Sequence, residues 1–193
     1  MPLAPNQQPQ RVEDIQRKLD RAVEMINADL DTKAEAKERQ IKEIYSKARS
    51  EAIQQAQAEK EDLEIDMKIK RRKAFSPPVL DSVDGRRPDP VAVQQAYMRA
   101  VEKLEEFTEQ EEILRQLQKA ELLNDPFLAK ACLVRGYQLN NSTIVGRYYD
   151  TYPDEKPVWD EFMDAAERYN EHERGMSFFS ASHRLRPLES YLA

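Results

Sequence analysis

The stretch from Val12 to Lys73 contains neither glycine nor proline, and no other feature of the chain restricts its fold as strongly. Ala, Glu, Gln, Lys and Arg dominate this stretch, and these residues are among the strongest helix formers. We therefore predict one very long N-terminal helix over residues 11–75, about 90 Å in length at 1.5 Å per residue. Residues 1–10 are polar and contain prolines, so we expect a flexible arm before it.

Apolar residues recur every eleven positions along this predicted helix. Eleven residues in three turns correspond to about 3.67 residues per turn, so the rows form an almost straight stripe along one face. A stripe of this kind needs a partner to bury it, either another subunit, a neighbouring protein or the C-terminal half of the same chain. The alternative is an isolated charged helix stabilised by pairs such as Glu38–Lys42. The two rows are Val12, Val23, Ala34, Tyr45, Ala56 and Met67, and Leu19, Leu30, Ile41, Ala52 and Leu63.

A basic cluster, Lys68-Ile69-Lys70-Arg71-Arg72-Lys73, closes the predicted helix. Such a cluster favours contact with nucleic acid or with an acidic protein surface. It is more typical of a solvated helix end, where positive charges complement the helix dipole. Both interpretations stay open.

The second half of the chain predicts a small helical domain over residues 90–175. Phe75-Ser76-Pro77-Pro78 stops the long helix, and residues 76–89 form a linker that marks the domain boundary. Asp89-Pro90 and Asp125-Pro126 are helix starts, with an acidic N-cap followed by proline. We expect one helix from Pro90 to about Leu123, a short one after Pro126, a third capped by Ser142, and a last one ending at Gly175. The expected core consists mainly of Phe127, Leu128, Tyr148, Trp159 and Phe162.

Residues 176–193 are expected to form an extended tail that is apolar for a chain end. Apolar anchors on an extended segment favour docking onto a neighbouring surface. The tail can equally fold back over its own domain. The anchors are Phe178, Phe179, Leu188 and Tyr191.

The sequence favours a protein that is not an enzyme and holds no cofactor or metal. Neither His172 nor His183 has the glutamate three residues earlier that di-iron bundles use. The single cysteine, Cys132, lies among apolar residues, as a buried structural thiol does. There is no phosphate-binding glycine loop, no apolar run of membrane-spanning length, and no signal-peptide pattern at the start.

A helix-turn-helix for DNA reading is a weaker alternative. Cys132, Gly136 and Val145 fit the small residue, the turn glycine and the buried aliphatic of that motif. However, only Arg147 is basic in the helix that would read DNA, and the net charge of the chain is -6. Phosphate contacts normally require several Lys or Arg residues.

The order of features after Asp89 resembles small helical virion or head–tail proteins of tailed bacteriophages, particularly those infecting actinobacteria. The resemblance covers about residues 89–193, and no catalytic residue carries over. It implies a connector or adaptor that is made in the host cytoplasm and built into the virion. Its partners would be portal, capsid or tail proteins and further copies of itself. The segments that carry the resemblance are Lys119–Leu123, Asp125–Ala131, Ile144–Pro153 and Trp159–Phe162.

Together these features predict an all-α structural protein that acts by helix packing and tail docking in an oligomer. A cellular coiled-coil adaptor is the alternative, with a DNA-binding regulator behind it. Lys70, Arg71, Arg72 and Lys73 are the candidate contacts to nucleic acid or an acidic surface. The residues expected at protein interfaces are Val12, Leu19, Val23, Leu30, Ile41, Tyr45, Leu63, Met67, Phe178, Phe179, Leu188 and Tyr191.

Overall fold

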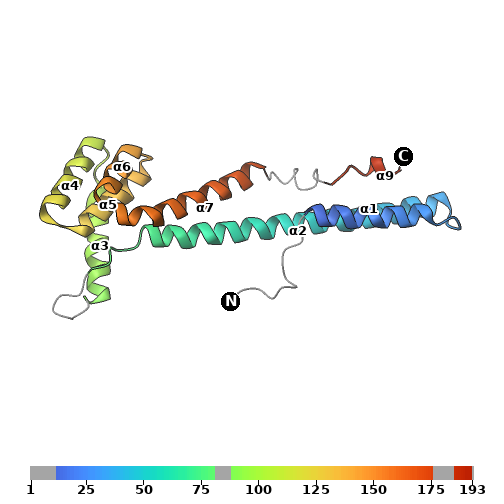
Figure 1. Ribbon diagram of the computed structural model, residues 1–193, viewed down its shortest axis with the longest axis horizontal. Coiled ribbons are helices and arrows are strands. Elements are labelled where there is room, and N and C mark those ends of the chain that lie inside the picture. The colour runs from blue at the N-terminus through green and yellow to red at the C-terminus, as the bar shows by residue number, and fades with distance from the viewer. Residues whose placement is uncertain (1–11, 81–87, 176–184, 193) are drawn as a thin grey trace. The chain divides into compact units, whose positions relative to one another are not determined.

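The computed structural model describes residues 12–80, 88–175 and 185–192, and in these ranges it contains helices and no strand (Figure 1). The predicted all-α class is therefore confirmed. The chain forms two compact units, which are described separately below. The first comprises Met1–Met67 with Ala165–Ala193, and the second comprises Lys68–Asp164.

The first unit begins with a helical hairpin. Helix α1 (Val12–Ala28) folds back along α2 (Ala34–Ala74), the long helix of the chain, as Figure 1 shows. The predicted long helix is thus confirmed in α2, but the expectation of a single helix over residues 11–75 is wrong. The Asp29 carboxylate accepts hydrogen bonds from the Asp31 amide at 2.9 Å and the Thr32 hydroxyl at 2.7 Å. These side-chain bonds hold a turn in place of helical backbone bonds.

The hairpin buries the apolar stripe inside the chain. Val12, Leu19 and Val23 of α1 lie in one cluster with Ile41 of α2, and each of the four is 3–5% exposed. The apolar stripe is therefore buried by a partner, as expected. That partner lies in the same chain: the apolar residues of α1 cover those of α2. The other buried members are Ile15, Ala48, Ala52 and Leu185, with Ile26, Ile44, Tyr45, Leu188 and Tyr191 packed against them.

The last turns of α7 (Lys156–Gly175) belong to the first unit and run antiparallel to α2. Lys60 pairs with Glu173, and Asp66 Oδ2 lies 3.2 Å from Arg168 Nη2. Buried side chains in these stretches include Ala56 and Ala165, at 7% and 1% exposure.

The second unit is a small helical bundle with α5 (Pro126–Gln138) at its centre. Around α5 pack α3 (Pro90–Glu105), α4 (Gln110–Leu123) and α6 (Ser142–Thr151). The 3₁₀ turn η2 (Pro153–Glu155) leads into α7. Of the expected core residues, Leu128, Tyr148, Trp159 and Phe162 are buried, and Phe127 is half-buried.

The helix starts of this unit follow local chemistry. The carboxylates of Asp89 and Asp125 cap α3 and α5 as expected, each accepting hydrogen bonds from amides at the helix start. The cap of α6 is Asn141, whose side chain accepts from two amides, so Ser142 is the first helical residue instead of the expected cap. The correction is small, because an asparagine is as good an N-cap as a serine.

One helix expected from Pro90 to Leu123 is divided in two. The Arg135 guanidinium, on α5, donates to the carbonyl oxygens of Phe107 at 2.8 Å and Glu105 at 3.0 Å. These bonds satisfy carbonyl groups at the end of α3 and hold the turn before α4. The bond comes from another helix, so the break leaves no glycine or proline signal in the local sequence.

The units do not divide the chain within the expected linker. Phe75 packs its ring against Tyr137, Trp159 and Phe162 of the second unit, with centroids 5.0, 5.9 and 5.7 Å away. Its carbonyl also accepts a hydrogen bond from the Tyr97 hydroxyl at 2.9 Å. The chain just after α2 is therefore part of the core of this unit. The Asp84-Gly85 portion of the linker lies outside the described residues.

Candidate interaction sites

The C-terminal segment 185–192, which we call the tail segment, docks on the helical hairpin of the first unit. Leu185 is 2% exposed and belongs to the buried cluster of α1 and α2. Two more side chains pack against the same cluster: Tyr191 of the short helix α9 (Glu189–Leu192) and Leu188, which directly precedes α9. The Tyr191 ring lies 6.3 Å from that of Tyr45. The sequence predicted either docking onto a neighbouring surface or folding back over its own helical domain, whereas this segment packs on the N-terminal hairpin of the same chain.

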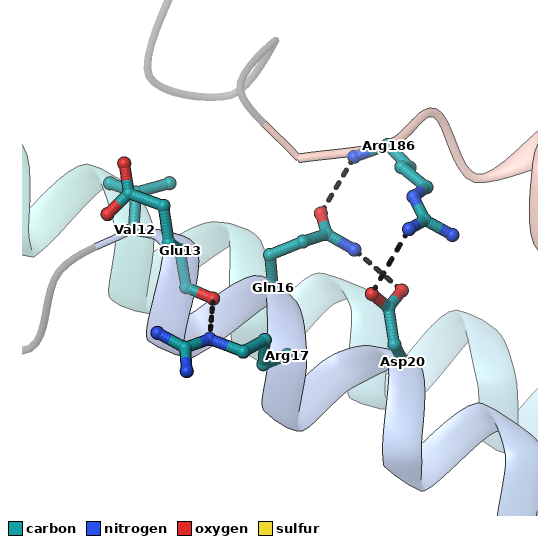
Figure 2. Close-up of a pocket in the computed structure, with 6 residues that line it drawn as sticks. All are labelled: Val12, Glu13, Gln16, Arg17, Asp20 and Arg186. Atoms are coloured by element: carbon teal, nitrogen blue, oxygen red, sulfur yellow. Dashed lines mark hydrogen bonds and ion pairs between the residues drawn. The ribbon is translucent and has the colours of Figure 1, made fainter.

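Polar contacts from α1 hold the tail segment (Figure 2). The Tyr191 hydroxyl donates to Asp20 Oδ1 at 2.6 Å and is itself hydrogen-bonded by the Gln16 amide. Gln16 Oε1 accepts from the Arg186 backbone amide at 2.9 Å, and the Arg186 guanidinium lies 3.5 Å from Asp20. Burial, with the bond to Asp20, raises the pKa of Tyr191 to about 12.

An open cavity of about 490 Å³ borders this contact. Figure 2 shows its lining from the first turns of α1 and from Arg186. We call Gln16, Asp20 and the buried cluster beneath the tail segment the tail seat. Gln16 and Asp20 were not expected from the sequence, because polar residues beside an apolar row are typical of a solvated helix face. The cavity is lined by Val12, Glu13, Gln16, Arg17, Asp20 and Arg186.

The expected interface residues fall into five groups. Four are buried inside the first unit, and three more lie half-buried around the same cluster, so the chain itself covers them. Leu30 is 94% exposed, because the chain reverses direction at this point of its row. Leu63 and Met67 are half-buried, and Phe178 and Phe179 lie outside the described residues. The first two groups are Val12, Leu19, Val23 and Ile41, and Tyr45, Leu188 and Tyr191.

The expected basic cluster borders a second cavity, on the second unit. Arg71, Arg72 and Lys73 are exposed and Lys70 is half-buried. The Arg71 guanidinium carbon lies 5.9 Å from the centre of the Tyr137 ring, within cation–π range. We call the cavity of about 320 Å³ beside them the basic hollow. It is lined by Arg71, Arg72, Phe75, Val134, Tyr137 and Gln138.

An acidic edge lies at the turn between α3 and α4. It consists of Glu105, Glu106, Glu109, Glu111 and Glu112, of which only Glu112 is half-buried. An open cavity of about 410 Å³ borders it. Within the described ranges, no group of three or more His, Cys, Asp or Glu residues is arranged to hold a metal ion.

The candidate chemical groups are placed as packing residues. Cys132 is fully buried, its thiol donates weakly to the Ile113 carbonyl at 3.8 Å, and burial raises its pKa to about 12. His172 has both ring nitrogens buried without a hydrogen-bond partner, with Nε2 3.9 Å from Glu59 Oε2. His183 lies outside the described residues.

A buried charged network that was not predicted from the sequence links α5, α6 and η2. Lys130 is 5% exposed and pairs with Glu155, which also accepts a hydrogen bond from the Tyr148 hydroxyl at 2.9 Å. Burial first, and then Glu155, raise the pKa of Tyr148 well above its ordinary value. An ammonium this deep is stable only because it is paired.

The features of the expected helix-turn-helix have other roles. Gly136 lies inside α5, not in the turn, and a Cβ there would be 2.7 Å from Ile144 Cγ2. Arg147 pairs with Glu121 of α4 at 2.9 Å, so the one basic residue of α6 is already neutralised.

No helix among the described residues combines the length and apolar character needed to cross a membrane. Comparison of the chain with protein-family models, with curated proteins and with solved structures finds no match.

Proposed function

We propose that this chain is a non-enzymatic structural protein of a tailed-phage particle, acting at the head–tail connection. In this proposal it works in a multimer, by helix packing and by docking of its C-terminal segment, and its partners are portal, capsid or tail proteins and other copies of itself. The phage setting rests on the sequence resemblance over residues 89–193. The mode of action rests on the geometry of the tail seat.

The docked tail segment is the observation that carries the proposal. It combines one fully buried anchor, Leu185, with hydrogen bonds that depend on side-chain identity. Gln16 donates to the Tyr191 hydroxyl, which donates to Asp20, and the Arg186 amide donates to Gln16. Short segments with apolar anchors and fixed polar contacts are a recurring means of joining protein surfaces. A helical hairpin with such a seat is suited to hold chain ends in an assembly.

The alternative of a DNA-binding regulator has less support, because Arg147 is paired and the chain is acidic. A cellular coiled-coil adaptor would use the same helix packing. Only the presence or absence of the chain in phage particles therefore distinguishes a virion protein from a cellular adaptor. The test is quantitative mass spectrometry of purified particles from cells that produce the chain.

The proposal predicts a fixed copy number of the chain per particle, retained through density-gradient purification. A chain shortened after residue 184 is expected to be depleted from particles, whereas Ser190→Ala is the matched control within the tail segment. Among the described residues the Ser190 hydroxyl donates to the nearby Pro187 carbonyl and takes no part in the tail seat contacts, so its loss leaves them intact. Absence of the full-length chain from purified particles would refute the proposal.

A further inference from the structure

The second unit carries two exposed groups of charged side chains of opposite sign, Arg71, Arg72 and Lys73 on one side and the glutamates of the acidic edge on the other, for which the described parts of the chain show no ion pair. We propose that two copies bind each other through these units, with the basic hollow of one copy against the acidic edge of the other. This inference rests on the proposed function in one respect, namely that the chain works as a multimer. It adds the surface through which two copies of the chain bind each other.

The basic side of this contact is a shaped surface with fixed charge. Arg71 is held over the Tyr137 ring, which leaves the N–H groups of its guanidinium available to a carboxylate. The rest of the hollow is lined by Arg72 and by apolar or neutral side chains, with no carboxylate among its lining residues. Arg72 and Lys73 have no ion pair within the described parts of the chain.

The acidic side presents several carboxylates over one turn. In the part of the chain that the structure describes, none of the five glutamate side chains of the edge has an ion pair or a hydrogen bond. Glu105, Glu106, Glu109 and Glu111 are exposed, and the negative charges of the edge outnumber the positive charges beside it, which are Arg115 in the same cavity and Arg135 at the Glu105 carbonyl. An arginine-rich surface of a second copy would supply the missing positive charge.

One side chain connects the two clusters. The Arg135 guanidinium donates to the carbonyls of Glu105 and Phe107, within or next to the acidic edge. Its Nη1 also donates, at 3.2 Å, to the side chain of Gln138, which lines the basic hollow. Hollow and edge are thus neighbours on one surface. Neighbouring patches of opposite charge make a surface self-complementary, so a two-fold contact joins each patch to its opposite twice.

A second copy fits this surface better than nucleic acid does. Binding of single strands usually uses an open aromatic face on which a base can stack. The Tyr137 ring is already surrounded by Arg71 and by Phe75, Trp159 and Phe162, at 5.0–5.6 Å between ring centroids. The adjacent acidic edge would also repel phosphate groups.

The test is a charge exchange in the full chain, followed by sedimentation velocity. Variant A carries Arg71→Glu and Arg72→Glu, and variant B carries Glu105→Lys and Glu106→Lys. Each variant alone places like charges across the contact. An equimolar mixture of A and B restores attraction at both halves of a two-fold contact. The control on α1, Lys18→Glu with Arg21→Glu, makes the same change in net charge as variant A at two exposed residues.

We expect the wild-type chain to self-associate at about 0.05 M salt. The affinity of this self-association should fall about tenfold or more at about 0.5 M salt, because salt screens exposed charges. A and B should each be monomeric, the mixture should form the A–B dimer, and the control should behave as wild type. Circular dichroism checks that each variant is folded. If variant A unfolds, the neutral variant Arg71→Gln with Arg72→Gln replaces it, and its self-association is expected to be weaker than that of the wild-type chain.

Three results would overturn the inference: a wild-type monomer at about 0.1 mM in low salt, association unchanged in folded A or B, or arginine-dependent binding of a single-stranded oligonucleotide. Particle incorporation is scored separately. If A and B enter particles as wild type does but show no altered association, the contact is wrong and the proposed function stands. If the charge-dependent dimer forms but the chain is absent from particles, the contact stands and the proposed function is wrong.

Discussion

Replacement of Gly136 by alanine tests the closest packing in the second unit. Gly136 lies inside α5 where α6 crosses it, and an added Cβ would be 2.7 Å from Ile144 Cγ2 and 2.9 Å from Ile144 Cβ. Ordinary contact begins at 3.4 Å, so the helices must separate by several tenths of an ångström. Ile144 is fully buried, and the backbone fixes the position of its Cβ, so a rotamer change moves Cγ2 but cannot relieve the 2.9 Å contact to Cβ.

Two effects of opposite sign decide the magnitude. Alanine is favoured over glycine in a helix interior by about 1 kcal/mol. Overpacking a close-packed core costs about 1–3 kcal/mol, and this contact lies at the upper end because two atoms are crowded. We therefore expect Gly136→Ala to lower the free energy of unfolding by about 1–2 kcal/mol. For a unit of roughly 100 residues, this lowers the Tm by about 4–16 °C.

Gly146 provides the matched control. It lies inside α6 and is exposed, and a Cβ there would meet nothing within 4 Å. Gly146→Ala should therefore stabilise the unit by up to about 1 kcal/mol through helix propensity alone. Urea unfolding of the full chain, followed by the fluorescence of its single tryptophan, Trp159, reports on this unit. If Gly136→Ala is as stable as wild type while Gly146→Ala is stabilised, the close approach of α5 and α6 is wrong.

Three further predictions address groups that the fold buries. Cys132, with its pKa raised to about 12 by burial, should resist alkylation at about pH 8 in the native chain and react fully in urea, whereas rapid native labelling would contradict its burial. Burial, and secondarily Glu155, raise the pKa of Tyr97 to about 12, so the stability that this group contributes is complete below about pH 10 and falls as pH rises from 10 toward 12. Urea unfolding across that range should show a shallower fall for Tyr97→Phe, which also loses the hydrogen bond to Phe75. His172→Leu should stabilise the first unit by about 1 kcal/mol in thermal unfolding at about pH 8, because two buried nitrogens without partners are removed; a loss of stability would indicate that the ring makes hydrogen bonds.

The parts of the fold that the sequence predicts are those fixed by neighbouring residues. Asp89-Pro90 and Asp125-Pro126 start helices because a carboxylate reaches amides two or three positions ahead, whatever the rest of the chain does. The all-α class follows in the same way from strong helix formers and few glycines. Of the expected core, four residues are buried because aromatic and aliphatic side chains have few alternatives in a small bundle.

The two helix breaks could not be predicted because they depend on contacts that leave little local signal. At residues 29–33 the Asp29 carboxylate replaces helical bonds, although neither glycine nor proline is present. At the end of α3 the bonds come from Arg135, 28 and 30 positions along the chain. The contact between the tail segment and the tail seat could be predicted only in part, for a related reason. Leu188 and Tyr191 stand out as apolar residues near the chain end, whereas Gln16 and Asp20 gain their role only once the tail segment lies across α1.

The eleven-residue stripe is covered largely by the chain itself. Periodicity identifies the face of a helix that is buried, but it does not identify what covers that face. Here α1 has 17 residues and α2 has 41, so the hairpin alone leaves the excess, 41 − 17 = 24 residues of α2, uncovered. The pairs of α7 with Lys60 and Asp66 fall in that excess length. Because the chain itself covers the stripe at Val12, Leu19, Val23 and Ile41, these side chains are closed to another molecule, and the charge exchange in the second unit tests exposed side chains instead.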